Sequence, residues 1–183
     1  KTRRSTYTSE GINKTYREER RMYIAPSTSG KVFIFRLAGS SPALHQHELF
    51  KQLYRNMPHA LIPVGYATIQ GREYIISQLL KRHETMGDYL EWLAGQSEKS
   101  AAQKRIRLAK AVGATLRDAH DIGMLHGDFH TWNILIKRNS RGFAVNPKII
   151  DLETSRNIGS VRGKKRRVDF KRLLDKTMEH YGP

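Results

Sequence analysis

The segment 126–151 constrains the fold of this chain more than any other part of the sequence. It opens with a polar run that holds Asp128 and Asn133, continues with the apolar residues 134–136, and closes with an apolar pair immediately before Asp151. Short apolar runs separated by turn residues are typical of paired strands. A β-hairpin would place Asn133 and Asp151 side by side and would let both side chains reach one metal ion.

These polar residues match the needs of phosphoryl transfer. The reaction needs an acceptor for the proton of the attacking hydroxyl, oxygen ligands for Mg²⁺ and cations near the phosphates, with little covalent chemistry for the protein. Asp128, Asn133 and Asp151 fit the first two needs. Each residue alone has a plainer interpretation, since Asp128 could cap a helix and Asp151 could be a turn residue. Their order and spacing together favour the catalytic interpretation.

The remaining sequence divides into a strand-rich first half and a helix-rich second half. Strand-forming runs around turn residues predict hairpins within 23–35 and 62–76, with a helix between them that begins at Pro42 and ends before Pro58. Helical spacing then predicts a short helix over 89–93, a long helix from about 100 to 122, and a basic helix from about 166. The expected apolar face of the long helix consists of Ala102, Ile106, Ala109, Val112, Leu116 and Ala119. This order indicates an α+β fold with two lobes.

Composition narrows the possible partners. The 183 residues include 33 Lys and Arg against 17 acidic residues, a formal charge of +16, and such a surplus attracts nucleic acid, anionic membranes or phosphorylated substrates. The absence of cysteine excludes disulfides, zinc–thiolate sites and thiol nucleophiles. No apolar run is long enough to span a bilayer and no signal-peptide pattern opens the sequence, so we expect a cytoplasmic protein.

The run from His126 to Asn133, with Asp151 after its strand, resembles the catalytic loop of protein-kinase-like phosphotransferases. The resemblance implies a bilobal α+β fold with a small β-rich N-lobe and a minimal helical C-lobe, and a reaction that uses ATP and Mg²⁺. We place the N-lobe, with a basic arm, a sheet and one helix, at 1–80. The C-lobe, with the catalytic loop and the basic C-terminal helix, would then be 81–183. Asp128 would be the catalytic base, with Asn133 and Asp151 as metal ligands and His126 as a structural histidine.

The loop carries His130 two residues after Asp128, and in this it is similar to the branch of the superfamily that phosphorylates sugars, choline and aminoglycosides. We therefore include His130 with Asp128 and Asn133 among the catalytic residues. The small size and the basic tail resemble bacterial lipopolysaccharide-core kinases, which phosphorylate heptose or Kdo. That resemblance implies an anionic glycan or glycolipid acceptor and peripheral contact with the cytoplasmic face of the inner membrane. A minimal atypical protein kinase, and a pseudokinase or nucleic-acid-binding module, stay open as alternatives.

The resemblance also implies residues that bind the nucleotide. Arg36 occupies the strand position where kinases carry a phosphate-binding Lys, and Glu48 on the following helix is its expected ion-pair partner. Lys14 lies where a glycine-rich phosphate loop belongs. Gln78 and Leu80 lie in the connector where the hinge between the lobes belongs, and we expect them to contact the nucleotide.

A second acidic residue stands near the end of the chain. Asp169, at the start of the last helix, either braces the catalytic loop or caps its own helix. The sequence leaves both interpretations open.

Overall fold

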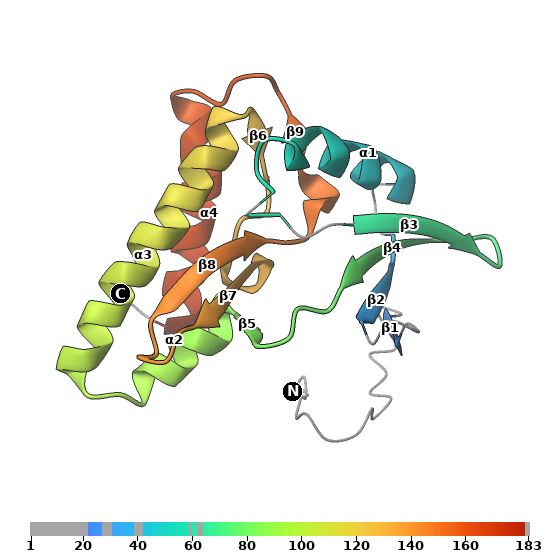
Figure 1. Cartoon of the computed structure of the whole chain (residues 1–183). Helices are drawn as coiled ribbons and strands as arrows, with labels where there is room; N and C mark the ends of the chain where they lie inside the picture. The colour runs from blue at the N-terminus through green and yellow to red at the C-terminus, as the bar shows by residue number, and fades with distance from the viewer. Residues whose placement is uncertain (1–21, 27–30, 39–41, 59, 62–63, 182–183) are drawn as a thin grey trace.

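The computed structural model describes residues 22–26, 31–38, 42–58, 60–61 and 64–181. A four-stranded sheet with one helix forms the smaller part of the molecule, and three further helices surround a second sheet in the larger part (Figure 1). This arrangement confirms the α+β, two-lobed fold that the sequence predicts. Among the described residues, no helix is both long enough and apolar enough to cross a bilayer.

The N-lobe sheet is antiparallel, in the order β1-β2-β4-β3. Its strands are β1 (Met22–Pro26), β2 (Val32–Leu37), β3 (Val64–Ile69) and β4 (Arg72–Gln78). The β1–β2 and β3–β4 pairs are the two predicted hairpins. The turn between β3 and β4 uses Gln70 and Gly71, both at positive φ, which a tight hairpin turn requires. Arg36 pairs with Ile75 of β4, so it belongs to an interior strand of the sheet.

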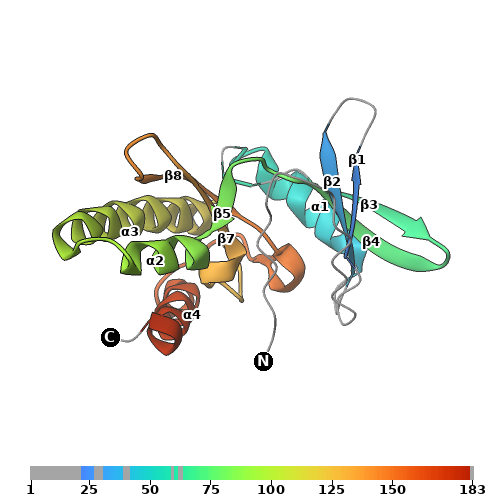
Figure 2. The same cartoon turned by 90° about the horizontal axis from the view of Figure 1, so that it is seen from below.

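Helix α1 (Ala43–Tyr54) covers one face of this sheet, beside β3 and β4 (Figure 2). Pro42 precedes the helix, as predicted, because a proline at a helix start gives up only an N–H that would otherwise lack a partner. The first helical amide, that of Ala43, donates to Glu73 Oε2 at 2.9 Å. Thus a strand carboxylate, rather than a residue of the helix itself, satisfies the start of α1.

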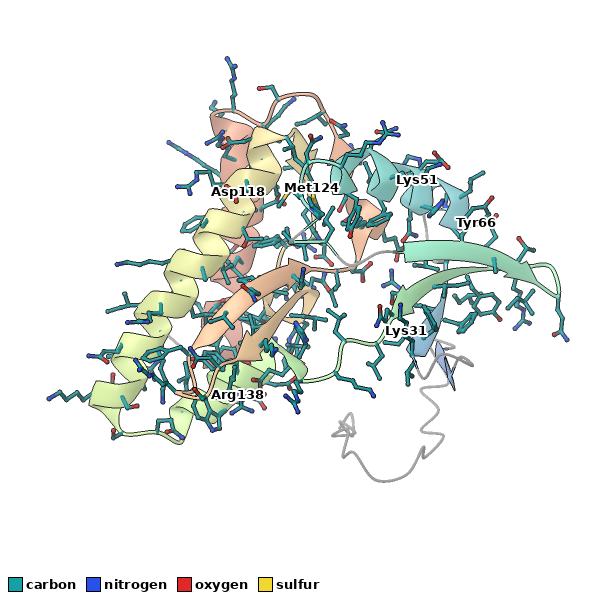
Figure 3. The ribbon with its side chains drawn as sticks, viewed as in Figure 1. Lys31, Lys51, Tyr66, Asp118, Met124 and Arg138 are labelled. Carbon is teal, nitrogen blue, oxygen red and sulfur yellow. The ribbon has the colours of Figure 1, made fainter. Side chains whose placement is uncertain are left out.

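The C-lobe begins with β5 (His83–Thr85) and α2 (Met86–Ala94), and continues with the long helix α3 (Glu98–Asp121) and β6 (Met124–Leu125). Strands β7 (Ile134–Arg138) and β8 (Ala144–Ile149) form a hairpin, and β5 adds to its β7 edge. The chain ends with β9 (Arg156–Asn157), which pairs with β6, and α4 (Lys164–Tyr181). Arg138, at the end of β7, lies beside α2, where its guanidinium stacks over Trp92 (Figure 3).

The buried face of α3 differs from the predicted one. The structure buries Ala101, Lys104, Leu108, Val112, Thr115, Leu116, Ala119 and His120. Ile106 is instead 56% exposed. Lys104 takes an inward position because its ammonium group lies over the Trp92 ring and bonds Ser100 Oγ at 3.0 Å. The predicted face was therefore wrong at its N-terminal end and correct from Val112 onward.

One apolar core runs through both lobes. It joins Leu53 and Met57, from α1 and the segment after it, to residues of α3 and of the β7–β8 hairpin. The backbone reinforces this junction, since Ile149 N donates to Ala60 O at 2.7 Å and Leu61 forms a parallel bridge with Ile149. The strand that leads into Asp151 is therefore fixed by the N-lobe as well as by its own hairpin.

Candidate active site

The loop between β6 and β7 carries most of the predicted site. It contains the turn of 3₁₀ helix η1 (Thr131–Asn133) and ends where β7 begins at Ile134. Gly127 adopts φ +78°, and a Cβ at this position would lie 3.0 Å from Thr154 O. Only glycine meets both conditions without strain, because L side chains rarely adopt this φ. The chain can therefore turn sharply between His126 and Asp128.

Asp169 braces this loop from α4. Its carboxylate accepts hydrogen bonds from the backbone N–H groups of His126 at 2.9 Å and Gly127 at 2.7 Å, and from His120 Nε2 at 3.0 Å. The side chain is fully buried. Burial by itself raises the pKa of Asp169, but the hydrogen bonds from His120 and the two amides outweigh it and hold the pKa below the ordinary value. Of the two interpretations open from the sequence, the bracing role is correct.

His126 links the loop to the strand before Asp151. Its Nε2 lies 3.0 Å from Ile150 O, which can only accept, and its Nδ1 accepts from Asp128 N at 3.3 Å. This pair of bonds fixes the neutral tautomer with the proton on Nε2. Burial lowers the pKa of His126, more strongly than the Ile150 carbonyl and the nearby carboxylates raise it. His126 is therefore the structural histidine that the resemblance implied.

The side chain of Asp128 has partners on both oxygens. His130 Nε2 lies 3.3 Å from Oδ2 and 3.2 Å from Asn133 Nδ2, and His130 Nδ1 accepts from Trp132 N. On the other side, Arg172 Nε of α4 donates to Oδ1 at 2.8 Å, and Arg172 Nη2 forms an ion pair with the same carboxylate at 2.7 Å. Sequence reasoning missed Arg172. The available signal was its place three residues after Asp169, on the same side of one helix.

Asn133 and Asp151 lie next to each other, as the predicted hairpin requires. Ile150 N donates to Asn133 O at 3.0 Å, and Ile134 pairs with Ile149 in the adjoining strands. Asn133 Nδ2 in turn donates to Asp128 O at 2.9 Å, which ties the proposed metal ligand to the proposed base. The backbone thus assembles all three polar residues of the motif.

Asp151 fits a metal ligand by an observation of its own. It adopts the left-handed conformation, at φ 63° and ψ 70°, and its Oδ1 is buried with no hydrogen-bond partner among the residues that the structure describes. A buried carboxylate oxygen without a donor is costly unless a cation meets it. Magnesium commonly takes one or two protein oxygen ligands together with substrate phosphates, so Asp151 and Asn133 are a suitable pair.

Arg36 meets Asp151 rather than the partner that the sequence suggested. Arg36 Nη1 lies 2.6 Å from Asp151 Oδ2, whereas Glu48 pairs with Lys51 at 3.0 Å on the exposed side of α1 (Figure 3). The expected Arg36–Glu48 pair is therefore wrong in this structure, because the left-handed Asp151 offers Arg36 a closer carboxylate. Burial alone raises the pKa of Asp151, but the hydrogen bond and charge of Arg36 outweigh it and lower the pKa.

Of the other residues predicted to contact the nucleotide, the structure describes Gln78 and Leu80 but not Lys14. Gln78 is the last residue of β4 and pairs with Phe33, and Leu80 follows it, half-buried, in the segment that leads to β5. Leu79 N donates to Val32 O at 2.8 Å, which fixes this connector against the sheet. Lys14 lies outside the described residues, so its expected role stays a prediction.

Comparison with known proteins agrees with the kinase-like arrangement of the loop. The model of the lipopolysaccharide kinase (Kdo/WaaP) family matches residues 4–181. No curated protein sequence matches the chain.

Several solved structures share the fold of this chain. WaaP in complex with acyl carrier protein is 17% identical with a TM-score of 0.64, over 90% of this chain and 70% of that chain. The BubR1 kinase domain is 14% identical with a TM-score of 0.56, over 76% of this chain and 44% of that one. The yeast RNA polymerase II CTD kinase CTDK-1 complex contains a chain 19% identical with a TM-score of 0.53, over 87% and 50%. These likenesses establish a protein-kinase-like fold.

Proposed function

The chain belongs to the lipopolysaccharide kinase (Kdo/WaaP) family, and we propose that it phosphorylates a heptose or Kdo hydroxyl of the lipopolysaccharide core. As a kinase of this family it takes its phosphoryl group from ATP. The observation that carries the assignment of the site is the joint placement of Asp128, Asn133 and Asp151 around one loop that Asp169 braces.

Asp128 is the proposed general base. It follows the sharp turn at Gly127, and its carboxylate is 31% exposed, so an acceptor hydroxyl can approach it. His130 lies against the same carboxylate, with its Nε2 3.3 Å from Oδ2, and this contact restricts rotation of the carboxylate. A base held in one orientation accepts the hydroxyl proton as the oxygen attacks, which is the positional contribution that phosphoryl transfer needs.

Asn133 and Asp151 are the proposed holders of Mg²⁺. An Mg²⁺ ion bound there would neutralise negative charge on the ATP phosphates. Arg36, on β2 of the N-lobe, would contact the same phosphates from the other side, with Gln78 and Leu80 of the connector beside the nucleotide. Arg36 forms an ion pair with Asp151 in the structure. The proposed assignment therefore requires this ion pair to loosen when the nucleotide binds.

The family favours a glycan acceptor over the two alternatives from the sequence, a minimal protein kinase and a pseudokinase or nucleic-acid-binding module. The deciding experiment measures transfer of labelled phosphate from Mg-ATP to lipopolysaccharide core, free sugars and protein in parallel. It compares the wild type with Asp128→Ala, Asp151→Asn and a control, Asp118→Asn, whose carboxylate lies on α3 away from the loop (Figure 3).

Labelled glycan from the wild type and the control, lost in both site variants, would support the proposal. Label on protein and never on glycan would select the protein-kinase alternative. No label on any acceptor, together with steeply salt-dependent RNA binding, would select the binding module.

Peripheral contact with the inner membrane is a further part of the proposal. On α4, Phe170, Leu174 and Met178 recur every four residues and are 59%, 46% and 46% exposed. Arg167 and Lys171 lie within one turn of these apolar residues. An exposed apolar stripe bordered by cations suits an anionic lipid surface, where each basic residue contributes about 1 kcal/mol.

Sedimentation with vesicles tests this contact. The protein should bind vesicles that contain phosphatidylglycerol more strongly than vesicles of phosphatidylcholine alone, and the double variant Phe170→Ser/Leu174→Ser should lose most of the binding. Equal sedimentation of the wild type and the double variant would contradict the assignment of α4. Binding to acyl carrier protein but not to vesicles would assign the stripe to a protein partner instead.

A further inference from the structure

We propose that Arg172 of α4 is a positioning residue for phosphoryl transfer, which fixes the carboxylate of Asp128 and binds an anionic group of the acceptor with its remaining N–H groups. The inference rests on the proposed function, because it assigns to Arg172 a part in recognising the acceptor at the Asp128 site. It adds a charged side chain to the Asp128 site from α4, at a separation of 44 residues along the chain.

The contact between the two side chains is specific in its geometry. Arg172 Nε donates to Asp128 Oδ1 at 2.8 Å, and Nη2 forms an ion pair with the same oxygen at 2.7 Å, while His130 Nε2 lies 3.3 Å from Oδ2. Each carboxylate oxygen therefore has a basic side chain beside it, one from the loop and one from α4. This arrangement leaves the carboxylate with one preferred orientation, which a general base in a catalytic site needs.

The position of Arg172 is set by the buried brace beside it. Asp169 lies three residues earlier on α4, so the two side chains project from the same side of the helix. Asp169 is fully buried and holds the amides of His126 and Gly127, which fixes α4 against the loop immediately before Asp128. The contacts of Asp169 with the loop therefore fix the position of α4, and with it the position of Arg172 beside Asp128.

Arg172 has further N–H groups that could bind a second anion. A guanidinium carries five N–H groups, and Asp128 accepts from Nε and lies 2.7 Å from Nη2, which leaves the other side of the group unused by this contact. The side chain is 50% exposed, so its remaining donors are open to a bound acceptor. The planar guanidinium is suited to carboxylates and phosphates, the anionic groups that a lipopolysaccharide core carries beside its hydroxyls. The geometry thus points to an acceptor with a negative charge next to the reacting hydroxyl.

A rival explanation is that Arg172 forms an ordinary surface ion pair. Such pairs contribute little to stability and have no effect on turnover. The same helix offers a matched control in Arg166, which pairs with Asp121 at 2.5 Å. The two arginines are similarly exposed, at 44% for Arg166 and 50% for Arg172, but Asp121 ends α3 and belongs to no part of the proposed site.

The test compares steady-state kinetics of the wild type, Arg172→Ala, Arg172→Lys and Arg166→Ala. Mg-ATP is the donor, and the acceptor is lipopolysaccharide core stripped of phosphate but retaining its Kdo carboxylates. We expect Arg172→Ala to lower kcat/KM for the acceptor about 100-fold, with a higher acceptor KM and little change in the KM for ATP. Arg172→Lys should recover much of the acceptor KM, since it keeps the charge, but not kcat, since it lacks the two-point contact with Asp128. Arg166→Ala should behave as the wild type.

A second acceptor isolates the anionic contact. With core whose Kdo carboxyl groups have been reduced to alcohols, the wild type should show the high acceptor KM of Arg172→Ala, and the Arg172→Ala variant should change little. Arg172→Ala kinetics equal to those of Arg166→Ala would overturn the inference while leaving the proposed function intact. Transfer by the wild type to protein alone would overturn the proposed function and, with it, the glycan contact of Arg172.

Discussion

Arg36 Nη1 lies 2.6 Å from Asp151 Oδ2, so the strand cation proposed to contact phosphate is bound directly to the carboxylate proposed to hold the metal. Both side chains are shielded, at 24% and 20% exposure, which strengthens their mutual attraction relative to a surface pair. The contact joins β2 of the N-lobe to Asp151, two residues after the end of β8 in the C-lobe.

Replacing Arg36 should weaken nucleotide binding. We expect Arg36→Ala to raise the KM for ATP about tenfold or more, because the phosphates lose a charged hydrogen-bond donor. The KM of Arg36→Lys for ATP should lie between those of the wild type and Arg36→Ala. Glu48→Gln is the control and should stay within about twofold of the wild type, because Glu48 pairs with Lys51. A loss in Glu48→Gln as large as that in Arg36→Ala would show that the Arg36–Glu48 pair forms during turnover.

Removing the charge of Asp169 should destabilise the whole C-lobe. Asp169→Asn weakens three hydrogen bonds to a buried carboxylate, and we expect the free energy of unfolding to fall by about 2–5 kcal/mol. Urea denaturation followed by circular dichroism measures this loss. Asp175→Asn, on the exposed side of the same helix, removes only a surface pair with Lys171 and should change stability by less than about 1 kcal/mol. Similar losses in both variants would contradict the bracing role.

His126 should make stability depend on pH below neutrality. Its pKa is lowered in the folded state from an ordinary value of 6.5, so the unfolded chain binds the proton more readily. Stability should therefore fall as the pH drops below about 6.5 toward the folded-state pKa, by up to about 1.4 kcal/mol per pH unit. Urea midpoints between pH 7.5 and 5.5 measure the slope. His126→Gln should flatten it, and an unchanged slope in that variant would assign the titration to another group.

Two glycine-to-alanine substitutions should have opposite effects. Gly127→Ala places a Cβ 3.0 Å from Thr154 O at a φ of +78°, and we expect a loss of about 1–3 kcal/mol in stability together with reduced activity. Gly113→Ala, within α3 and with nothing within 4 Å of its Cβ, should stabilise the protein by about 0.5–1 kcal/mol. Thermal denaturation of both variants provides the measurement. A neutral result at Gly127 would mean that the loop can turn without its left-handed residue.

Local sequence patterns predicted the N-lobe hairpins, the four helices and the strand pair at the centre of the candidate site, but not the short strands β5, β6 and β9. Both hairpins of the N-lobe and the adjacency of Asn133 and Asp151 depend on strand pairing close in sequence, which turn residues and apolar runs specify. The inward position of Lys104 was unpredictable from periodicity alone, because it depends on a ring contributed by another helix.

The partners of charged residues were harder to predict for a physical reason. The sequence suggested Glu48 as the partner of Arg36, whereas Arg36 pairs with Asp151 of the other lobe, a contact that local sequence patterns do not specify. Arg172 was missed because its contact with Asp128 spans a long stretch of chain and follows from how α4 docks. Helix spacing from Asp169 indicates the shared side of α4, but the docking itself comes from the buried hydrogen bonds of Asp169.

The bracing of the loop by α4 has a consequence for the order in which the protein becomes functional during synthesis. Residues 126–133 leave the ribosome well before Asp169 and Arg172, so the nascent loop at first lacks the acceptor for its amides and the cation for its base. A chain arrested before α4 should have its nucleotide-facing strands but no ordered catalytic loop. Activity would then begin only after the last helix has emerged and docked.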